Sequence, residues 1–180
     1  MKEIKAIDYS IWIGENSLSK LDISTYSKVA ILVDENTKRD CLFKLPQIEN
    51  ALIIEIKSGE EYKNISTCSF IWEQLTKNNF DRNSLLINLG GGVIGDMGGF
   101  CAATYKRGLD FIHIPTTLLA MVDASVGGKL VIDFKGFKNQ IGLFNNPKAV
   151  LISSEFLETL AESELKSGFA EVVKHALISD

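Results

Sequence analysis

Four short apolar runs, separated by segments with helical spacing, constrain the fold of this 180-residue chain more than any other feature. Each run is nearly continuous, which is typical of strands buried on both faces of a parallel sheet. The intervening segments carry apolar residues at helical intervals. This β-α alternation predicts an α/β fold with a doubly wound parallel sheet that binds ligands at the carboxyl ends of its strands. The expected strands cover residues 29–33, 51–56, 85–89 and 111–114, and the expected helices cover 36–45, 62–77 and 95–105.

Both ends of the chain depart from this pattern. Residues 4–13 alternate polar and apolar side chains, as an edge hairpin does. After Pro115 we expect a short helix over 116–121, an extended piece over 129–133 and a long helix over 162–178. That last helical run reaches Asp180 without the Gly or Pro that ends many helices. We therefore expect an α/β domain over 1–153, followed over 154–180 by the first helices of an all-helical C-terminal domain that is truncated.

Composition limits the binding partners and the cellular compartment that we expect for this chain. A net charge of -4 provides no overall attraction to nucleic acid or to an anionic membrane. The N-terminus lacks an apolar signal region, and no stretch of about 18 apolar residues occurs. Cys41, Cys68 and Cys101 lack C-x-x-C spacing, which favours reduced, buried thiols. We expect a cytoplasmic protein with no nucleic-acid or membrane partner.

The stretch 90–100 contains a glycine-rich loop between an expected strand and an expected helix. Gly90, Gly92 and Gly95 form G-x-G-x-x-G, which lets backbone approach a pyrophosphate at a helix N-terminus. This favours a Rossmann-like dinucleotide site, the alternative being a glycine turn packed tightly on the sheet. Two features differ from a standard Rossmann unit. The loop follows a late strand, and Asp96 places a carboxylate beside the phosphate, where it is expected to contact hydroxyls or cap the helix.

Polar residues also follow two other expected strands. Asp34 and Asn36 stand where a carboxylate can accept hydrogen bonds from sugar hydroxyls, although Asp34 is equally suited to cap a helix. Glu60 and Lys63 follow the next strand and could reach the same nucleotide, or could belong to a charged turn.

A second group of polar residues lies between 123 and 139. Lys129 and Lys138, with Asp123 and Asn139, suit a small polyhydroxylated anion, because ammonium groups bind phosphate or carboxylate while Asp and Asn bind hydroxyls. The alternative is a solvated surface. Arg107, at a helix end, could contact the same anion or pair with the helix dipole.

The last helix presents Glu171, Lys174 and His175 on one side. Glu171 and His175 could ligate a divalent metal, although a catalytic zinc site needs three protein ligands and the pair could be only a polar face. His113 lies within an apolar strand and is expected to be a core residue.

Taken in order, the motifs at 90–100, 115–129, 138–139 and 167–174 resemble the 3-dehydroquinate synthase family. The resemblance runs from Asp34 to the last residue. It implies a phosphate-eliminating carbon–oxygen lyase of the shikimate pathway, converting 3-deoxy-D-arabino-heptulosonate 7-phosphate to 3-dehydroquinate with bound NAD and a divalent metal, zinc or cobalt. It implies that residues 1–153 form the NAD-binding domain.

The resemblance also implies roles for individual residues. The substrate contacts would be Asp123, Lys129, Asn139 and Lys174, Glu171 would bind the metal, and His175 would be a bystander. Arg107 would reach the phosphate bound by a neighbouring subunit, so a homodimer is expected. The implied NAD contacts are Asp34, Asn36, Glu60, Lys63, Gly91, Gly92, Val93, Thr116, Thr117, Lys138, Phe156, Leu157, Glu158 and Thr159.

Since the family's other metal ligands lie beyond residue 180, we expect the chain to be inactive alone. Three alternatives stay open: another sugar-phosphate cyclase, a metal-dependent polyol dehydrogenase and a stand-alone NAD-binding module.

Overall fold

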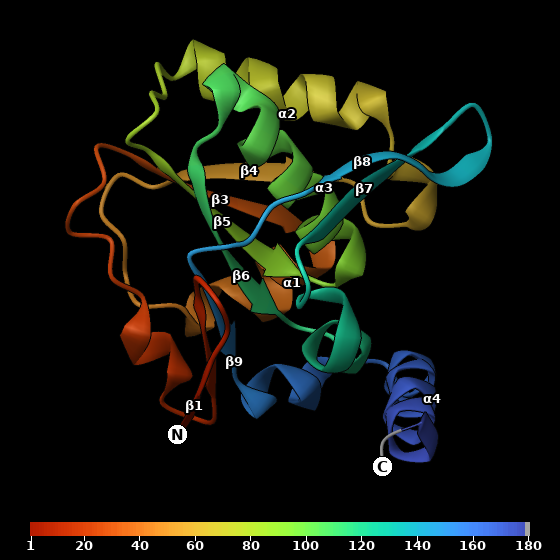
Figure 1. The fold of residues 1–180 in the computed structure, drawn as a ribbon. Coiled ribbons are helices and arrows are strands. Elements are labelled where there is room, and N and C mark those ends of the chain that lie inside the picture. Colours follow the sequence, from red (N-terminus) through yellow and green to blue (C-terminus); the bar gives the residue numbers. More distant parts are fainter. Residues whose placement is uncertain (179–180) are drawn as a thin grey trace.

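A seven-stranded sheet organises the computed structural model, which describes residues 1–178 (Figure 1). The strand order is β1-β2-β9-β6-β5-β3-β4, and all neighbours are parallel except the edge pair β1–β2. The expected parallel α/β sheet is therefore confirmed, as is the N-terminal hairpin. The strands are β1 (Lys2–Lys5), β2 (Ser10–Ile13), β3 (Val29–Asp34), β4 (Leu52–Ile56), β5 (Leu85–Gly90), β6 (Asp110–Pro115) and β9 (Ala149–Ile152).

The strand order places a topological switch between β3 and β5. From β3 the chain continues outward to β4, and from β5 it continues in the opposite direction to β6. The order β4-β3-β5-β6-β9 is that of flavodoxin-like folds, in which ligands bind where the direction reverses. The glycine loop does follow a late strand, but that strand lies directly beside β3. Asp34 and Gly90 consequently end neighbouring strands at the switch point.

Helices and a hairpin cover the sheet on both faces. One hydrophobic cluster joins Ala30 and Leu32 to α2 (Ile65–Lys77), α3 (Gly92–Thr104) and the strand β7 (Lys129–Phe134). The alternate residues of β3, such as Ile31, face the other cluster, beneath shorter helical turns. These turns are η1 (Ser17–Lys20), α1 (Glu35–Asp40), η2 (Leu42–Lys44), η5 (Ala120–Ala124) and η6 (Ser154–Thr159). Figure 1 shows α2, α3 and the hairpin above one face of the sheet.

Several elements differ from expectation. Helix α3 begins before the expected range 95–105, α2 begins after the start of the expected range 62–77, and the short helix expected over 116–121 is the π-helical turn η5. The helix expected over 36–45 is shorter, because α1 ends before Cys41 and a separate 3-10 turn follows. The expected extended piece 129–133 is β7, and it pairs with the unexpected strand β8 (Phe137–Phe144), which is mostly exposed and so lacks an apolar pattern. The strand β9 was also not expected. Its four apolar residues are too few to show a period.

The long helix α4 (Glu162–Ile178) confirms the helical run expected after residue 162 and packs against η5, at the lower right of Figure 1. Gly168 makes this crossing possible, because a Cβ there would lie 2.6 Å from the Cβ of Leu118. Other apolar residues of α4 remain exposed, namely Leu165, Phe169, Val173 and Leu177. Within residues 1–178, no helix combines the length and apolarity needed to cross a membrane.

Candidate nucleotide and substrate site

The glycine loop opens α3 with unpaired backbone donors. Gly91 is the N-cap residue and no side chain within residues 1–178 caps the helix, so the first N–H groups of α3 point out of the loop without a side-chain partner there. These donors and the positive end of the helix dipole suit an anion. A 13-residue helix that begins uncapped at the switch point therefore has the geometry of a phosphate site.

The glycines of this motif have different structural roles. A Cβ at Gly98 would overlap the side chains of Asn88 and Leu32, so this glycine allows α3 to pack closely on β5 and β3. A Cβ at Gly92 would meet only Ala124, at 3.5 Å, which is ordinary contact. The close packing of α3 on the sheet therefore requires Gly98, whereas Gly92 leaves open space above the loop.

The segment after β6 lies against the loop, as the predicted contacts of Thr116 and Thr117 require. The Thr116 N–H donates to the carbonyl of Gly90 (3.0 Å), and a Cβ at Gly91 would lie 3.0 Å from Thr117 Cγ2. The Thr117 hydroxyl accepts from the Ala120 N–H (3.2 Å) and so starts the helical turn that leads to Asp123.

Asp34 is the N-cap of α1. Its Oδ1 accepts from the Thr37 N–H at 2.7 Å, which confirms the capping alternative; no hydrogen bond to Oδ2 occurs within residues 1–178. Next to it, the Glu35 carboxylate accepts from the backbone and hydroxyl of Ser58 (2.9 and 2.7 Å). This contact, which sequence analysis missed, joins the loops after β3 and β4. The exposed Asn36 lies in the first turn of the same helix.

A cleft of about 450 Å³ lies beside α3. The predicted residues Asp96, Asp123, Lys129 and Asn139 line it together, although they come from α3, η5, β7 and β8. The side chain of Phe144 was not expected here and forms part of the apolar wall. The cleft therefore combines carboxylate, ammonium and amide groups around a space large enough for a sugar-sized molecule.

Lys63 does not extend toward solvent as a turn residue would. Only 4% of it is exposed, and its Nζ donates to Asp96 Oδ2 (2.6 Å) and Asn139 Oδ1 (2.9 Å). Burial raises the pKa of the Asp96 carboxyl, and the ammonium of Lys63 acts against that shift. By contrast, Glu60 and Lys138 form an exposed ion pair, with 3.6 Å between Oε1 and Nζ.

Helix α4 directs its polar side toward η5. Lys174 forms an ion pair with Glu171 and lies 4.0 Å from Asp123 Oδ2, while His175 Nε2 lies 3.9 Å from Asp123 Oδ1. The ion pair raises the pKa of Lys174. His175, expected to be a bystander, is thus a neighbour of the cleft. Among residues 1–178, no three His, Cys, Asp or Glu side chains gather as metal ligands.

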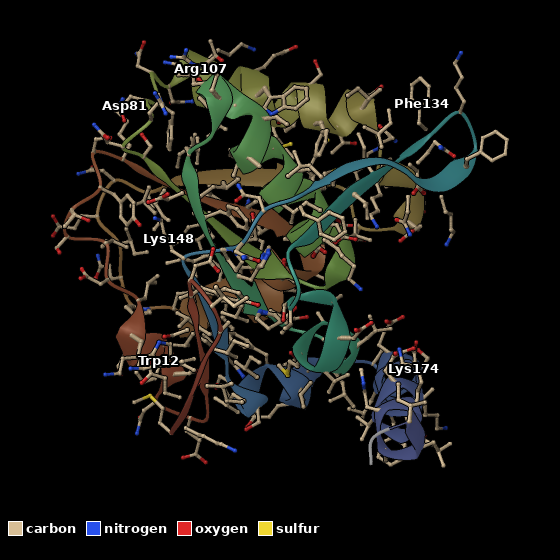
Figure 2. All side chains as sticks on the ribbon, in the orientation of Figure 1. Trp12, Asp81, Arg107, Phe134, Lys148 and Lys174 are labelled. Atoms are coloured by element: carbon tan, nitrogen blue, oxygen red, sulfur yellow. The ribbon has the colours of Figure 1, made fainter. Side chains whose placement is uncertain are left out.

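Two predicted groups lie away from the cleft. Arg107 follows α3 at the amino end of the sheet, and Figure 2 shows it at the opposite end of the molecule from Lys174. In η6, Phe156 is buried in the core and Glu158 pairs with Lys44 at 3.1 Å, while Leu157 and Thr159 belong to the same turn. The structure does not bring these residues into the cleft.

Buried polar residues beneath the loop were not predicted as part of the site. Asn88 on β5 and His113 on β6 approach each other at 3.4 Å and line a small cavity behind the glycine loop, together with Ser125. His113 is buried as expected, and burial lowers its pKa to about 4. The only sequence signal for Asn88 and His113 is that each is a polar residue within an otherwise apolar strand. Cys41, Cys68 and Cys101 are buried free thiols, as expected.

Comparison with curated proteins supports the resemblance. The chain is 46% identical over 183 residues to a bifunctional 3-dehydroquinate synthase/phosphatase of Fusobacterium nucleatum, covering 98% of this chain and 27% of that protein. It is 48% identical over 180 residues to the 3-dehydroquinate synthase of Campylobacter concisus, covering 98% of this chain and 51% of the relative. The chain therefore spans about half the length of such relatives, or less.

Solved structures share the fold. A 2-deoxy-scyllo-inosose synthase, solved with carbaglucose-6-phosphate, NAD+ and Co2+, matches 99% of this chain and 52% of its own with a TM-score of 0.84 and 27% identity. An iron-containing alcohol dehydrogenase of Thermotoga maritima matches 97% of this chain and 54% of its own, with a TM-score of 0.73 and 19% identity, which shows the fold alone.

The fold and site define the Rossmann-like α/β part of the sugar-phosphate cyclase fold. The family model described as 3-dehydroquinate synthase N-terminal matches residues 53–167. The chain belongs to the 3-dehydroquinate synthase family.

Proposed function

We propose that this chain supplies the NAD-binding half of a 3-dehydroquinate synthase, which converts 3-deoxy-D-arabino-heptulosonate 7-phosphate to 3-dehydroquinate and phosphate. One observation carries the proposal. The uncapped N-terminus of α3 lies next to a cleft whose lining includes Asp96, Asp123, Lys129 and Asn139. An anion-binding helix end and a polar, sugar-sized cleft thus share one edge of the sheet.

The residues around the loop fit a dinucleotide. Gly91, Gly92 and Val93 would donate backbone N–H groups to the pyrophosphate, for which Gly92 leaves the space. Asp34 would accept from ribose hydroxyls through Oδ2, since only Oδ1 serves the cap. When bound, NAD accepts and returns a hydride. The contacts would be completed by Glu60, Lys138, Asn36, Thr116, Thr117 and η6.

In the cleft, the side chains would hold an acidic sugar phosphate. Lys129 would pair with an anionic group, and Asp123 would accept hydrogen bonds from ring hydroxyls. Lys174 stands 4.0 Å from Asp123 and would bring a second ammonium to the same edge. Val131, Leu143 and Phe144 would make apolar contacts with one side of the ligand.

The described residues do not fit a complete divalent-metal site. Glu171 is the predicted ligand, yet no second and third donor gather around it within residues 1–178, and it pairs with Lys174. A catalytic zinc ion needs three protein ligands. We therefore assign no step to a metal here, and propose that zinc or cobalt binds only when further ligands are supplied.

The position of Arg107 supports a homodimer. Arg107 lies at the opposite end of the molecule from Lys174 (Figure 2), so it would act on the site of a second copy. We also propose the domain division at residue 153, since η6 and α4 follow the last strand of the sheet and α4 contacts η5. The cytoplasmic location remains a prediction.

Four measurements test the proposal. Calorimetric titration with NAD+ should show saturable binding to the 180-residue chain. Phosphate release from the heptulosonate phosphate should require the region corresponding to the second half of the relatives, supplied separately. NMR identification of the product distinguishes 3-dehydroquinate from the product of another cyclase. Net NADH formation would favour a polyol dehydrogenase and contradict the proposal, and turnover by the chain alone would contradict its expected inactivity.

A further inference from the structure

A turn of two glycines separates Asp123 and Lys129, which line the same cleft. Gly127 and Gly128 have positive φ angles of 92° and 67°, a conformation that other residues rarely adopt. Asp123 lies in η5 shortly before this turn, and Lys129 begins β7 directly after it. The path of the turn therefore sets where the ammonium group lies relative to the carboxylate in the cleft.

Local contacts fix the two ends of this turn. The Val126 N–H donates to the Asp123 carbonyl (3.1 Å), which ties the start of the turn to η5. The Gly128 carbonyl accepts from the Asn145 N–H (2.9 Å), which ties its end to the segment after β8. The N–H of Gly127 lies between these two contacts, and its partner comes from a distant part of the chain.

That partner is the hydroxyl of Tyr9, 118 residues away in the sequence. The Gly127 N–H donates to Tyr9 Oη at 3.4 Å, a long hydrogen bond. Tyr9 is itself held in place, because it is 9% exposed and packs with Ile11 and Val150 in the hydrophobic cluster that lies on the face of the sheet away from α3. Its carbonyl also accepts from the Ala6 N–H (2.9 Å). The hydroxyl of Tyr9 thus gives the turn a fixed point that the residues of the turn do not supply.

The residue before Tyr9 holds the other side of the turn. Asp8 Oδ1 accepts from Asn146 Nδ2 at 2.8 Å. Asn146 lies so close to Gly128 that a Cβ there would come within 2.5 Å of Asn146 Oδ1. The loop between β1 and β2 therefore contacts the turn directly at Gly127 and flanks it at Gly128 through Asn146.

We propose that Tyr9 is a positioning residue: its hydroxyl holds the Gly127–Gly128 turn and thereby places Lys129 relative to Asp123. The ligand that fits this arrangement carries a hydroxyl for the carboxylate and an anionic group for the ammonium, as a sugar phosphate does. This inference rests on the proposed function for the identity of the ligand. It gives the N-terminal hairpin, which is remote from the cleft in sequence, a part in shaping the substrate site.

A ligand-independent NMR experiment tests the contact first. Tyr9→Phe removes the hydroxyl and keeps the ring in the core. Amide hydrogen exchange at Gly127 should become at least about twofold faster, the lower end for loss of one hydrogen bond, and the ε-methylene signals of Lys129 should shift. Tyr26→Phe is the matched control, because it removes a hydroxyl that donates to Asp110 Oδ2 (3.2 Å) and should change neither readout. Unchanged exchange at Gly127 or unshifted Lys129 signals in Tyr9→Phe would overturn the proposal.

Gly127→Ala tests the turn from its other side and does not depend on how Tyr9→Phe folds. A Cβ at Gly127 would meet no atom of residues 1–178 within 4 Å, so this substitution acts on the backbone conformation at a φ of 92°. We expect the ε-methylene signals of Lys129 to shift in this variant too. A folded Gly127→Ala chain in which these signals are unshifted would show that the turn does not place Lys129, and would overturn the proposal.

NMR titration with 3-deoxy-D-arabino-heptulosonate 7-phosphate, and separately with NAD+, extends the test to the ligands. Tyr9→Phe should weaken sugar-phosphate binding at least about twofold and leave the NAD+ affinity unchanged. In a Lys129→Met chain, adding Tyr9→Phe should cause no further loss, because the hydroxyl acts through Lys129. Losses that multiply would show that Tyr9 affects the ligand by another route and would refute its positioning role. If the unmodified chain binds no sugar phosphate, that part of the proposed function fails, while the exchange at Gly127 and the Lys129 signals still decide the role of Tyr9.

Discussion

Replacing Gly98 with alanine tests whether the glycine motif serves two separate purposes. A Cβ at Gly98 would lie 2.6 Å from Asn88 Cγ and 2.8 Å from Leu32 Cδ2, and both of these residues are buried in strands. Overpacking of this kind costs roughly 1–3 kcal/mol, and we expect the upper half because neither neighbour can withdraw. Alanine regains up to about 1 kcal/mol of helix propensity, so a net loss of about 2 kcal/mol is expected.

Gly92→Ala is the matched control in the same helix. Its Cβ would make one ordinary contact, with Ala124 at 3.5 Å, so the free energy of unfolding should change by less than about 0.5 kcal/mol. The same methyl group would occupy the space where a pyrophosphate approaches the loop. We therefore expect NAD+ affinity to fall at least about tenfold, or about 1.4 kcal/mol, although the fold is intact.

Urea unfolding followed by circular dichroism, together with NAD+ calorimetry, measures both effects. A loss of 2 kcal/mol corresponds to a melting temperature lower by roughly 4–8 °C in a chain of this size. If Gly98→Ala were as stable as the unmodified chain, the close packing of α3 on the sheet would be refuted. If Gly92→Ala bound NAD+ normally, the loop would not be the phosphate site.

Three further outcomes are expected. Burial lowers the pKa of His113 from 6.5 to about 4, so the unfolded chain binds more protons than the folded chain between these pH values. The free energy of unfolding should therefore fall by up to about 3 kcal/mol as the pH drops from 6.5 to 4. In urea unfolding over the same pH range, the stability of His113→Phe should depend less on pH. Asp34→Ala should lose about 1 kcal/mol of capping energy, whereas Asp34→Asn should keep the cap but lower NAD+ affinity; equal stability of the two variants would contradict the capping role. Titration of the chain with Co2+ should show no absorption band of a tetrahedral site, because Glu171 lacks partner ligands among residues 1–178; such a band would refute this.

Much of the sheet could be predicted because burial leaves a local pattern. Strands covered on both faces are continuous apolar runs, and the four predicted runs are the strands β3, β4, β5 and β6. The strand β8 was missed because its residues are mostly exposed and its partner β7 supplies the burial. The polar residues that line the cleft were recognised from their chemistry and motif, but the apolar lining residues Val131, Leu143 and Phe144 carried no such signal.

Lys63 shows where local reasoning stops. Its neighbours along the chain suggest an exposed charged turn, while its partners Asp96 and Asn139 lie 33 and 76 residues away. Burial of an ammonium depends on such distant groups, because only they can replace its hydration. Nothing in the residues near Lys63 encodes that pairing.

Local periodicity and turn chemistry thus determined the strands β3, β4, β5 and β6, the helix cap at Asp34 and the family, since each depends on residues close together in sequence. Tertiary structure alone decided that β5 lies beside β3, that the hairpin β7–β8 covers α3, and that Arg107 lies away from the cleft. These outcomes depend on how distant segments share buried surface, and that free energy exists only once the chain has folded.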